Sequence, residues 1–238
     1  MRHGPCAVLW IALLAAGGCA PQAPSAARIE AFAMQASQQQ STAAERRLHQ
    51  WAEQGAVAAQ RELGLLYAQR PARAADGMRW LLRAADSGDA EAACALGDAL
   101  RTHIPPAPGA AWPWYARAAA LGHARAALML GLLARNGDGV ARDPALAMAW
   151  LNRAAGRGNA HAMFLLANML RDGEAGRADP VRARAWLEQA ADHEYPAAMQ
   201  ELALTVQHGD AQSSKDALRA QHLLKEANEH RHNNWNHF

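Results

Sequence analysis

The chain has 238 residues and contains 61 alanines but only five valines and three isoleucines, a composition that favours helices and excludes a protein built mainly from β-sheet. Apolar residues make up 51% of the chain and charged residues 19%, which excludes wholesale disorder. The formal net charge is +2, so no strong field attracts nucleic acid, and we expect no nucleic-acid partner.

Residues 1–18 have the features of a signal peptide. Arg2 supplies a basic start, and an uncharged apolar run follows from residue 7 to residue 16. This run is too short to cross a bilayer, because a membrane-spanning helix needs roughly 20 residues. Ala16-Gly17-Gly18-Cys19 resembles a bacterial lipobox, with Ala16 in place of the preferred Leu. The resemblance implies that Cys19 is lipidated; the alternative is secretion with cleavage after Gly18 or Ala20.

The residue after the cysteine is Ala20 and not Asp, which in known lipoproteins is typical of the outer membrane. We therefore expect a lipid-anchored outer-membrane protein that faces the periplasm, or otherwise a periplasmic protein. Residues 19–27 are rich in Pro, Ala and Ser and predict a short tether. Cys6 lies in the signal, so Cys94 is the only thiol of the body, and no internal disulfide is possible there.

Two helices are expected between the tether and the rest of the chain, over residues 27–39 and 43–54. Residues 43–54 resemble the second helix of a repeating unit, but no matching first helix precedes them. We interpret residues 28–55 as an N-terminal cap, which a repeat array needs in order to cover its first apolar face.

The body of the chain, residues 56–230, repeats itself five times. Residues that end helical segments recur with spacings of 33, 34, 36 and 36, at Gly55, Gly88, Gly122, Gly158 and Glu194. The first half of each unit carries a Leu followed by a small residue, at Leu63, Leu96, Leu130, Leu166 and Leu202, with an Ala four positions earlier. The second half carries a Trp and, four positions later, paired alanines, at Trp80, Trp114, Trp150 and Trp186. The apolar positions recur at helical spacing, so each unit predicts two helices.

This pattern resembles the Sel1-like repeat, a relative of the tetratricopeptide repeat. The third unit is nearest to the family pattern, with Leu130-Gly131, the turn of residues 136–140, and Trp150-Leu151. The resemblance implies an all-α fold: an α-solenoid of about five helix-turn-helix repeats that forms a right-handed superhelix. Residues 231–238 are polar and predict a flexible C-terminal tail.

Unit two departs from the pattern where its second helix should begin. Pro105, Pro106, Pro108 and Pro113 fall there, and proline inside a helix costs about 3 kcal/mol. We therefore expect this helix to begin near Pro113, after an irregular loop that carries Trp112 as an exposed aromatic anchor. In units three and four, Asp143-Pro144 and Asp179-Pro180 predict capped helix starts.

One face of each first helix varies between units while the buried positions barely change. It comprises positions 3, 6, 10 and 13 after each anchor, which share one helical face. The residues are Glu91, Cys94, Asp98 and Arg101 in unit two, Arg125, Leu128, Leu132 and Arg135 in unit three, His161, Phe164, Asn168 and Arg171 in unit four, and Ala197, Gln200, Leu204 and Gln207 in unit five. First helices line the concave side in the families that the chain resembles. The resemblance therefore implies that this strip, which we call the concave strip, is a binding groove.

Two features of the concave strip allow opposing interpretations. Arg101, Arg135 and Arg171 recur at its last position, where they could bind carboxylates of a partner, or could simply solvate a helix end. Leu128, Leu132 and Phe164 could anchor a partner or pack against the neighbouring unit. Cys94 could be reactive or could be an ordinary small apolar residue.

We expect no cofactor, no metal and no small-molecule substrate. His222, His230, His232 and His237 crowd the C-terminal end, but no Cys or paired carboxylate joins them. The sequence contains no nucleophile elbow, no zinc-protease motif and no nucleotide fingerprint. Hydrolysis of β-lactams, which has been linked to cysteine-rich members of the family, is disfavoured because those members carry a disulfide in each repeat.

The sequence thus predicts a non-enzymatic scaffold or adaptor lipoprotein that binds a partner in the bacterial envelope. The alternative within binding functions is an immunity protein that neutralises a secreted antibacterial effector, such as a phospholipase. The resemblance to Sel1-like proteins implies both possibilities, the envelope scaffold and the immunity protein.

Overall fold

A computed structural model describes residues 24–102, 108–209 and 215–234, with the side chains of residues 231–234 left out. Cys19, the predicted signal peptide and most of the predicted tether lie outside this part of the chain. The described residues form helices and connecting turns. The helices are α1 (Ala26–Gln38), α2 (Thr42–Glu53), α3 (Val57–Ala68), α4 (Ala74–Asp86), α5 (Ala90–Thr102), α6 (Pro108–Ala120), α7 (Ala124–Asn136), α8 (Pro144–Ala155), α9 (Ala160–Asp172), α10 (Pro180–Asp192), α11 (Pro196–His208) and α12 (Ala217–Asn234), with a short 3₁₀ turn η1 (Pro71–Arg73) before α4.

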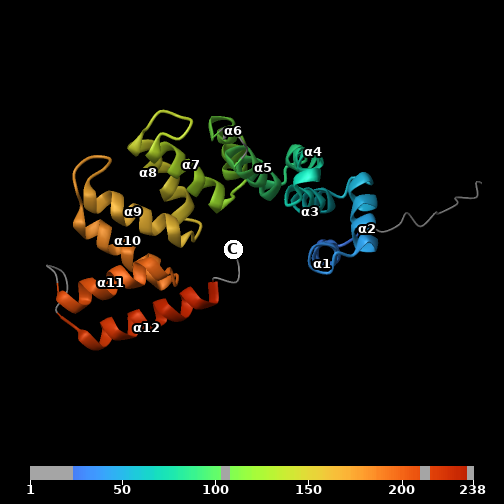
Figure 1. Ribbon diagram of the computed structural model, residues 1–238. Helices are drawn as coiled ribbons and strands as arrows, with labels where there is room; N and C mark the ends of the chain where they lie inside the picture. Colours follow the sequence, from blue (N-terminus) through green and yellow to red (C-terminus); the bar gives the residue numbers. More distant parts are fainter. Residues whose placement is uncertain (1–23, 103–107, 210–214, 235–238) are drawn as a thin grey trace, which may run out of the picture.

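The helices follow one another along an arc as antiparallel pairs (Figure 1). Helices α1 and α2 lie where the two N-terminal helices are expected, and the five pairs from α3/α4 to α11/α12 are the five predicted units. The all-α solenoid is therefore confirmed. Helix α12 continues to Asn234, so the first part of the predicted tail, from residue 231, is helical.

Capping side chains set the helix boundaries. Asp143 accepts the backbone N–H of Leu146 at 2.9 Å, and Asp179 accepts that of Arg182 at 3.0 Å, which satisfies amides that have no partner within the helix. All four anchor glycines have positive φ, between 82° and 96°. Glu194, in the fifth anchor position, is forced into the same left-handed region with φ 59°.

Alanine and leucine pack the units against each other. Leu130, Leu151 and Leu166 are completely buried, as are the repeated alanines Ala154 and Ala162. The small residue after each leucine permits close approach of the paired helix. A Cβ placed on Gly131 would stand only 2.7 Å from Leu151 Cγ, so the pairing of α7 with α8 depends on that glycine.

The predicted start of the second helix in unit two is wrong. Helix α6 begins at Pro108, and Pro113 lies inside it. Pro108 occupies the first helical position, where its missing N–H costs nothing, so only the hydrogen bond from Pro113 is forfeited. The first turn of α6 also packs against the turn of unit three, because a Cβ on Gly109 would meet the Gly139 carbonyl oxygen at 2.8 Å. This contact between units favours the earlier start.

Candidate functional site: the concave strip

Side chains of successive first helices, or of residues that flank these helices, meet along the strip. Side chains bridge successive first helices, or the residues next to them, at all four junctions from unit one to unit five. Between second helices, the described residues show one such ion pair, Asp86–Arg117. Neighbouring elements lie closest on the inner side of a curved array. In Figure 1, α3 and α5 accordingly lie below α4 and α6, toward the opening of the arc.

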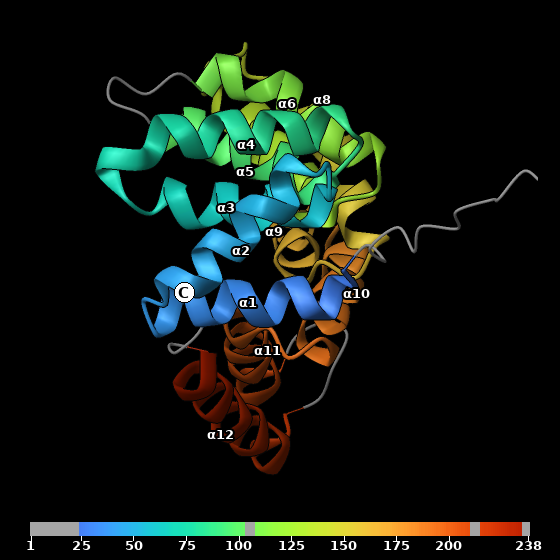
Figure 2. The same cartoon turned by 90° about the vertical axis from the view of Figure 1, so that its right-hand side faces the viewer.

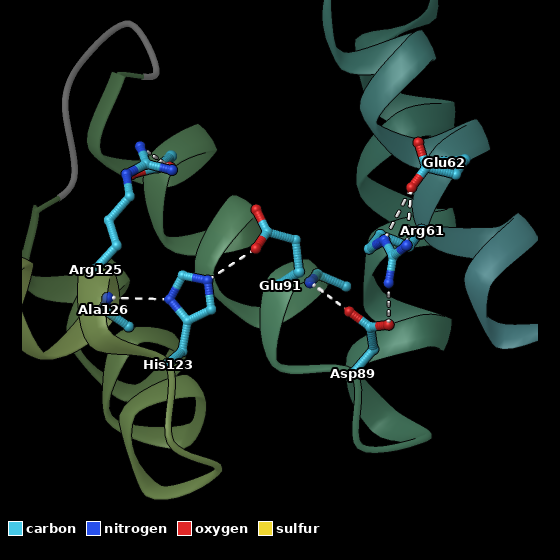
Figure 3. A network of polar contacts seen from close by, with 9 residues as sticks. Arg61, Glu62, Asp89, Glu91, His123, Arg125 and Ala126 are labelled. Carbon is cyan, nitrogen blue, oxygen red and sulfur yellow. Dashed lines mark hydrogen bonds and ion pairs between the residues drawn. The ribbon is translucent and has the colours of Figure 1, made fainter. Parts of the chain in front are cut away.

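At the first two junctions the charged side chains pair with each other (Figure 3). Arg61 of α3 lies 3.0 Å from Asp89, the residue before α5. His123 Nδ1 accepts the N–H of Ala126 at 3.1 Å, so Nε2 carries the proton and donates to Glu91 at 2.8 Å. This hydrogen bond holds the pKa of Glu91 below its usual value. Glu91 therefore joins α5 to the residue that precedes α7.

Asp98 connects three helices through its two oxygens. The Tyr115 hydroxyl of α6 donates to Oδ1 at 2.7 Å, and Arg125 of α7 donates to Oδ2 at 2.7 Å. Burial and the bond to Asp98 raise the pKa of Tyr115, so the phenol stays neutral. Asp98 and Arg125 thus stabilise the array.

Two of the three arginines at the last position of the strip also have partners within the chain. Arg135 forms a two-pronged pair with Glu174, with 2.9 Å between Nε and Oε2, and Arg171 binds both Asp172 and Glu201. Both guanidiniums have a raised pKa, chiefly because these carboxylates accept their hydrogen bonds. Arg101 has no carboxylate partner among the described residues. Arg135 and Arg171 thus each bind a carboxylate of the next unit, and Arg171 also binds Asp172 of its own unit.

The second half of the strip is apolar and aromatic. Leu128 is buried, and Leu132 and Phe164 are half-buried. The Tyr195 ring lies 5.4 Å from Phe164 and stacks on His161 at 5.3 Å with an interplanar angle of 15°. Burial lowers the pKa of His161, so its ring is neutral at pH 7. We call His161, Phe164 and Tyr195 the aromatic patch.

Three further strip residues of units four and five, Asn168, Gln200 and Leu204, are uncharged. Asn168 Oδ1 is buried and has no hydrogen-bond partner in the described part of the chain. Gln200 is half-buried, and Leu204 is 54% exposed on α11. Together with the aromatic patch, these residues form the uncharged part of the strip on units four and five.

Trp112 does not belong to the strip. It lies on α6 instead of a loop, is half-buried, and packs edge-on against Trp150 with 6.5 Å between ring centroids. The expectation of an exposed anchor is wrong because α6 begins five residues earlier than predicted and carries Trp112 into the interface with α8.

Cys94 is fully buried, and burial raises the pKa of its thiol to about 12. A thiol that stays protonated is a poor nucleophile, so Cys94 acts as a small apolar residue. Among the described residues no group of three or more His, Cys, Asp or Glu side chains could hold a metal ion. His222 and His230 instead lie near Glu226 and Glu194, at 3.3 and 3.5 Å.

Three participants at this face were missed by the sequence analysis: Arg61, His123 and Tyr195. Arg61 lies in the first unit, which the strip analysis did not include. His123 and Tyr195 each directly follow an anchor residue, and Asp89 and Asn159 hold the equivalent position. The residue at this position precedes the first helix as its N-cap and contacts the preceding unit. It is not among positions 3, 6, 10 and 13, which define the strip.

A comparison with protein families identifies five Sel1 repeats, at residues 57–89, 90–123, 124–159, 160–195 and 196–232. The chain belongs to the Sel1 repeat family. A comparison with curated protein sequences finds no match. The Sel1 repeat array is a protein-interaction scaffold.

Solved structures share the fold. A Sel1 repeat protein from Oxalobacter formigenes is 24% identical, with 86% of this chain and 88% of that chain covered and a TM-score of 0.74. A protective antigen of uropathogenic Escherichia coli is 23% identical, with 86% and 46% covered and a TM-score of 0.70. An immunity protein from Pseudomonas aeruginosa is 17% identical, with 88% and 82% covered and a TM-score of 0.57.

Proposed function

We propose that this Sel1 repeat protein is a non-enzymatic adaptor that binds a partner protein on units four and five of the concave strip. The observation that carries the proposal is the division of the strip. Apart from Arg101, its charged residues pair within the chain, including Arg171 with Glu201, whereas the aromatic patch, Asn168, Gln200 and Leu204 have no such partners among the described residues. Half-buried aromatic rings beside an unpaired amide are typical of the anchors that dominate interface energies.

We further propose that the adaptor works in the bacterial envelope, anchored through Cys19 to the outer membrane and facing the periplasm. The small-residue sequence before Cys19 and the short apolar run support this location. None of the helices in the described residues is long and apolar enough to cross a bilayer. Labelling cells with a radioactive fatty acid tests the anchor: label is expected in the wild type and lost in Cys19→Ala.

Crosslinked pull-down from native envelopes tests the binding surface. The variant is Leu204→Glu, which places a charge on an exposed position of the strip without breaking a buried contact. The matched control is Leu146→Glu on α8, where the leucine is 38% exposed on a second helix. The proposal expects a partner that Leu204→Glu loses and Leu146→Glu retains. Retention by both variants would place the partner elsewhere.

The likeness to Pseudomonas aeruginosa immunity proteins supports a second candidate, inhibition of a secreted effector. The two functions predict different complexes. An immunity protein forms a tight one-to-one complex with a single toxin, whereas an assembly adaptor captures several envelope proteins. Masses and stoichiometries of the crosslinked products separate the two.

A further inference from the structure

A cavity of about 270 Å³ lies away from the concave strip, between the second helix of the cap and the second helix of unit one. Residues of α2, η1 and α4 line it, and Figure 2 shows α2 and α4 on the side turned toward the viewer. The cavity has an aromatic wall, because the edge of His49 meets Trp80 with 5.5 Å between ring centroids.

Arg73, Arg79 and Arg83 line this cavity with Glu53 and Asp76, and Arg73 also pairs with Glu45 outside the lining at 3.3 Å. Glu53 lies 3.5 Å from His49, and Asp76 binds both Arg73, at 3.2 Å, and Arg79. Both lining carboxylates are therefore already engaged.

Arg83, the third arginine of the lining, differs from Arg73 and Arg79, which bind Asp76. Its guanidinium lies 4.7 Å from the centroid of the Trp80 ring, and no carboxylate pairs with it in the described residues. Stacking on an indole holds a guanidinium flat while its N–H edges stay available. The cavity thus has a positioned, uncompensated cation at its wall.

The residues equivalent to Arg83 in units two and three have different surroundings. Arg117 in unit two bonds to Asp86 at 3.0 Å. Arg153 in unit three stacks on Trp150 at 4.9 Å, but Ala149 stands where unit one has Arg79. The turn of unit one, which contains η1, carries Arg73 into the cavity. The concentration of guanidiniums is therefore a property of unit one and not of the repeat.

We propose that this cavity is a second docking site, which binds a carboxylate side chain of an acidic protein segment. The Arg83 fork matches a carboxylate in two-pronged geometry, and Trp80 and His49 offer apolar contact to the chain on either side of it. Glu53 and Asp76 favour a singly charged carboxylate over a phosphate, because they repel a second negative charge. The protein can then hold one partner on the concave strip and another on the outer side.

Fluorescence anisotropy with the full chain tests the proposal. The probe is a fluorescein-labelled octapeptide of alternating Glu and Ala, and its control has Gln in place of each Glu. We expect the Glu peptide to bind roughly tenfold more tightly than the Gln peptide, since charge-assisted hydrogen bonds are about twice as strong as neutral ones. Arg83→Gln is expected to remove most of this difference.

Matched variants locate the site. Arg153→Gln removes the equivalent stacked cation of unit three, and Leu204→Glu alters the concave strip; both are expected to keep wild-type affinity for the Glu peptide. Circular dichroism verifies that each variant is folded. Equal binding of both peptides, equal losses in Arg83→Gln and Arg153→Gln, or displacement of the peptide by equimolar inorganic phosphate would each overturn the proposal. Loss of the concave partner in Leu204→Glu with retained peptide binding separates this site from the proposed function.

Discussion

Single backbone positions with left-handed geometry decide how the units join. Four of the five anchors are glycines, and the fifth, Glu194, adopts the same conformation with a side chain present. Gly139 has φ 71° and lies against the first turn of α6. At both positions the backbone torsion angle affects how the next unit packs, so substitutions there are expected to change the stability of the protein.

Replacement of Glu194 by glycine is expected to stabilise the protein. A left-handed residue with a Cβ costs about 1–2 kcal/mol, and glycine recovers this minus roughly 0.5–1 kcal/mol of backbone entropy. The contact of Glu194 with His230 offsets little, because the glutamate side chain is 67% exposed. Urea unfolding should show a gain for Glu194→Gly and none for Glu194→Ala, which keeps the Cβ. A glycine variant less stable than the alanine variant would contradict the strain argument.

Gly139→Ala is expected to destabilise the protein more than Gly88→Ala. Both glycines have positive φ, so both substitutions introduce the same kind of backbone strain. A Cβ on Gly139 would also lie 2.1 Å from the backbone nitrogen of Gly109, whereas one on Gly88 meets nothing within 4 Å. The clash should add about 1–3 kcal/mol, the usual cost of overpacking. Thermal unfolding of the two variants measures the difference, and equal losses would show that α6 can shift freely.

Ion pairs and hydrogen bonds between successive first helices act at the scale of elements. Arg61–Asp89, Glu91–His123 and Arg135–Glu174 each join residues about 30 to 40 positions apart, one unit to the next. Most of these side chains are partly shielded from water, which strengthens them relative to ordinary surface pairs. The concave strip therefore stabilises the array along its whole length, and on units four and five it also carries uncharged side chains that offer contact area.

Glu174→Gln is expected to reduce the free energy of unfolding by about 1 kcal/mol at pH 7, since it breaks a charge-assisted two-pronged pair. The bond from Arg135 lowers the pKa of Glu174 in the folded state. A lowered pKa stabilises the fold above the unfolded pKa, near 4.3, and this contribution is lost as the pH falls through the folded value. The gap between wild type and variant should therefore shrink on acidification. Glu229→Gln, at an exposed pair on α12, is the control and should change stability little at any pH.

At the scale of the whole molecule, the core is a chain of local clusters. Among the described residues the buried apolar side chains form three groups, one around α1 to α3, one from α4 to α7, and one from α7 to α12. Each unit contacts mainly its neighbours, so stability is expected to be a sum of unit and interface contributions. Damage at one end should therefore remain local.

Hydrogen exchange measured by mass spectrometry tests this independence. Leu48→Ala removes a fully buried side chain from α2 and should cost about 2–5 kcal/mol locally. We expect faster exchange in α1 to α3 and unchanged exchange in α9 to α11. Leu202→Ala, in α11, should give the reverse pattern. Faster exchange along the whole array in either variant would show one cooperative unit.

The number of units, their boundaries and their helix pairs could be derived from the amino-acid sequence because they depend on local signals. Capping residues, apolar spacing and the anchors act within one helix or turn, and they recur five times. The start of α6, the pairing of Arg135 with Glu174 and the stack of His161 on Tyr195 could not be derived this way. Each depends on side chains or backbone brought together from different units, and the curvature of the array sets those distances. Proline content alone therefore misplaced α6, and spacing alone could not show which charged residues bind each other.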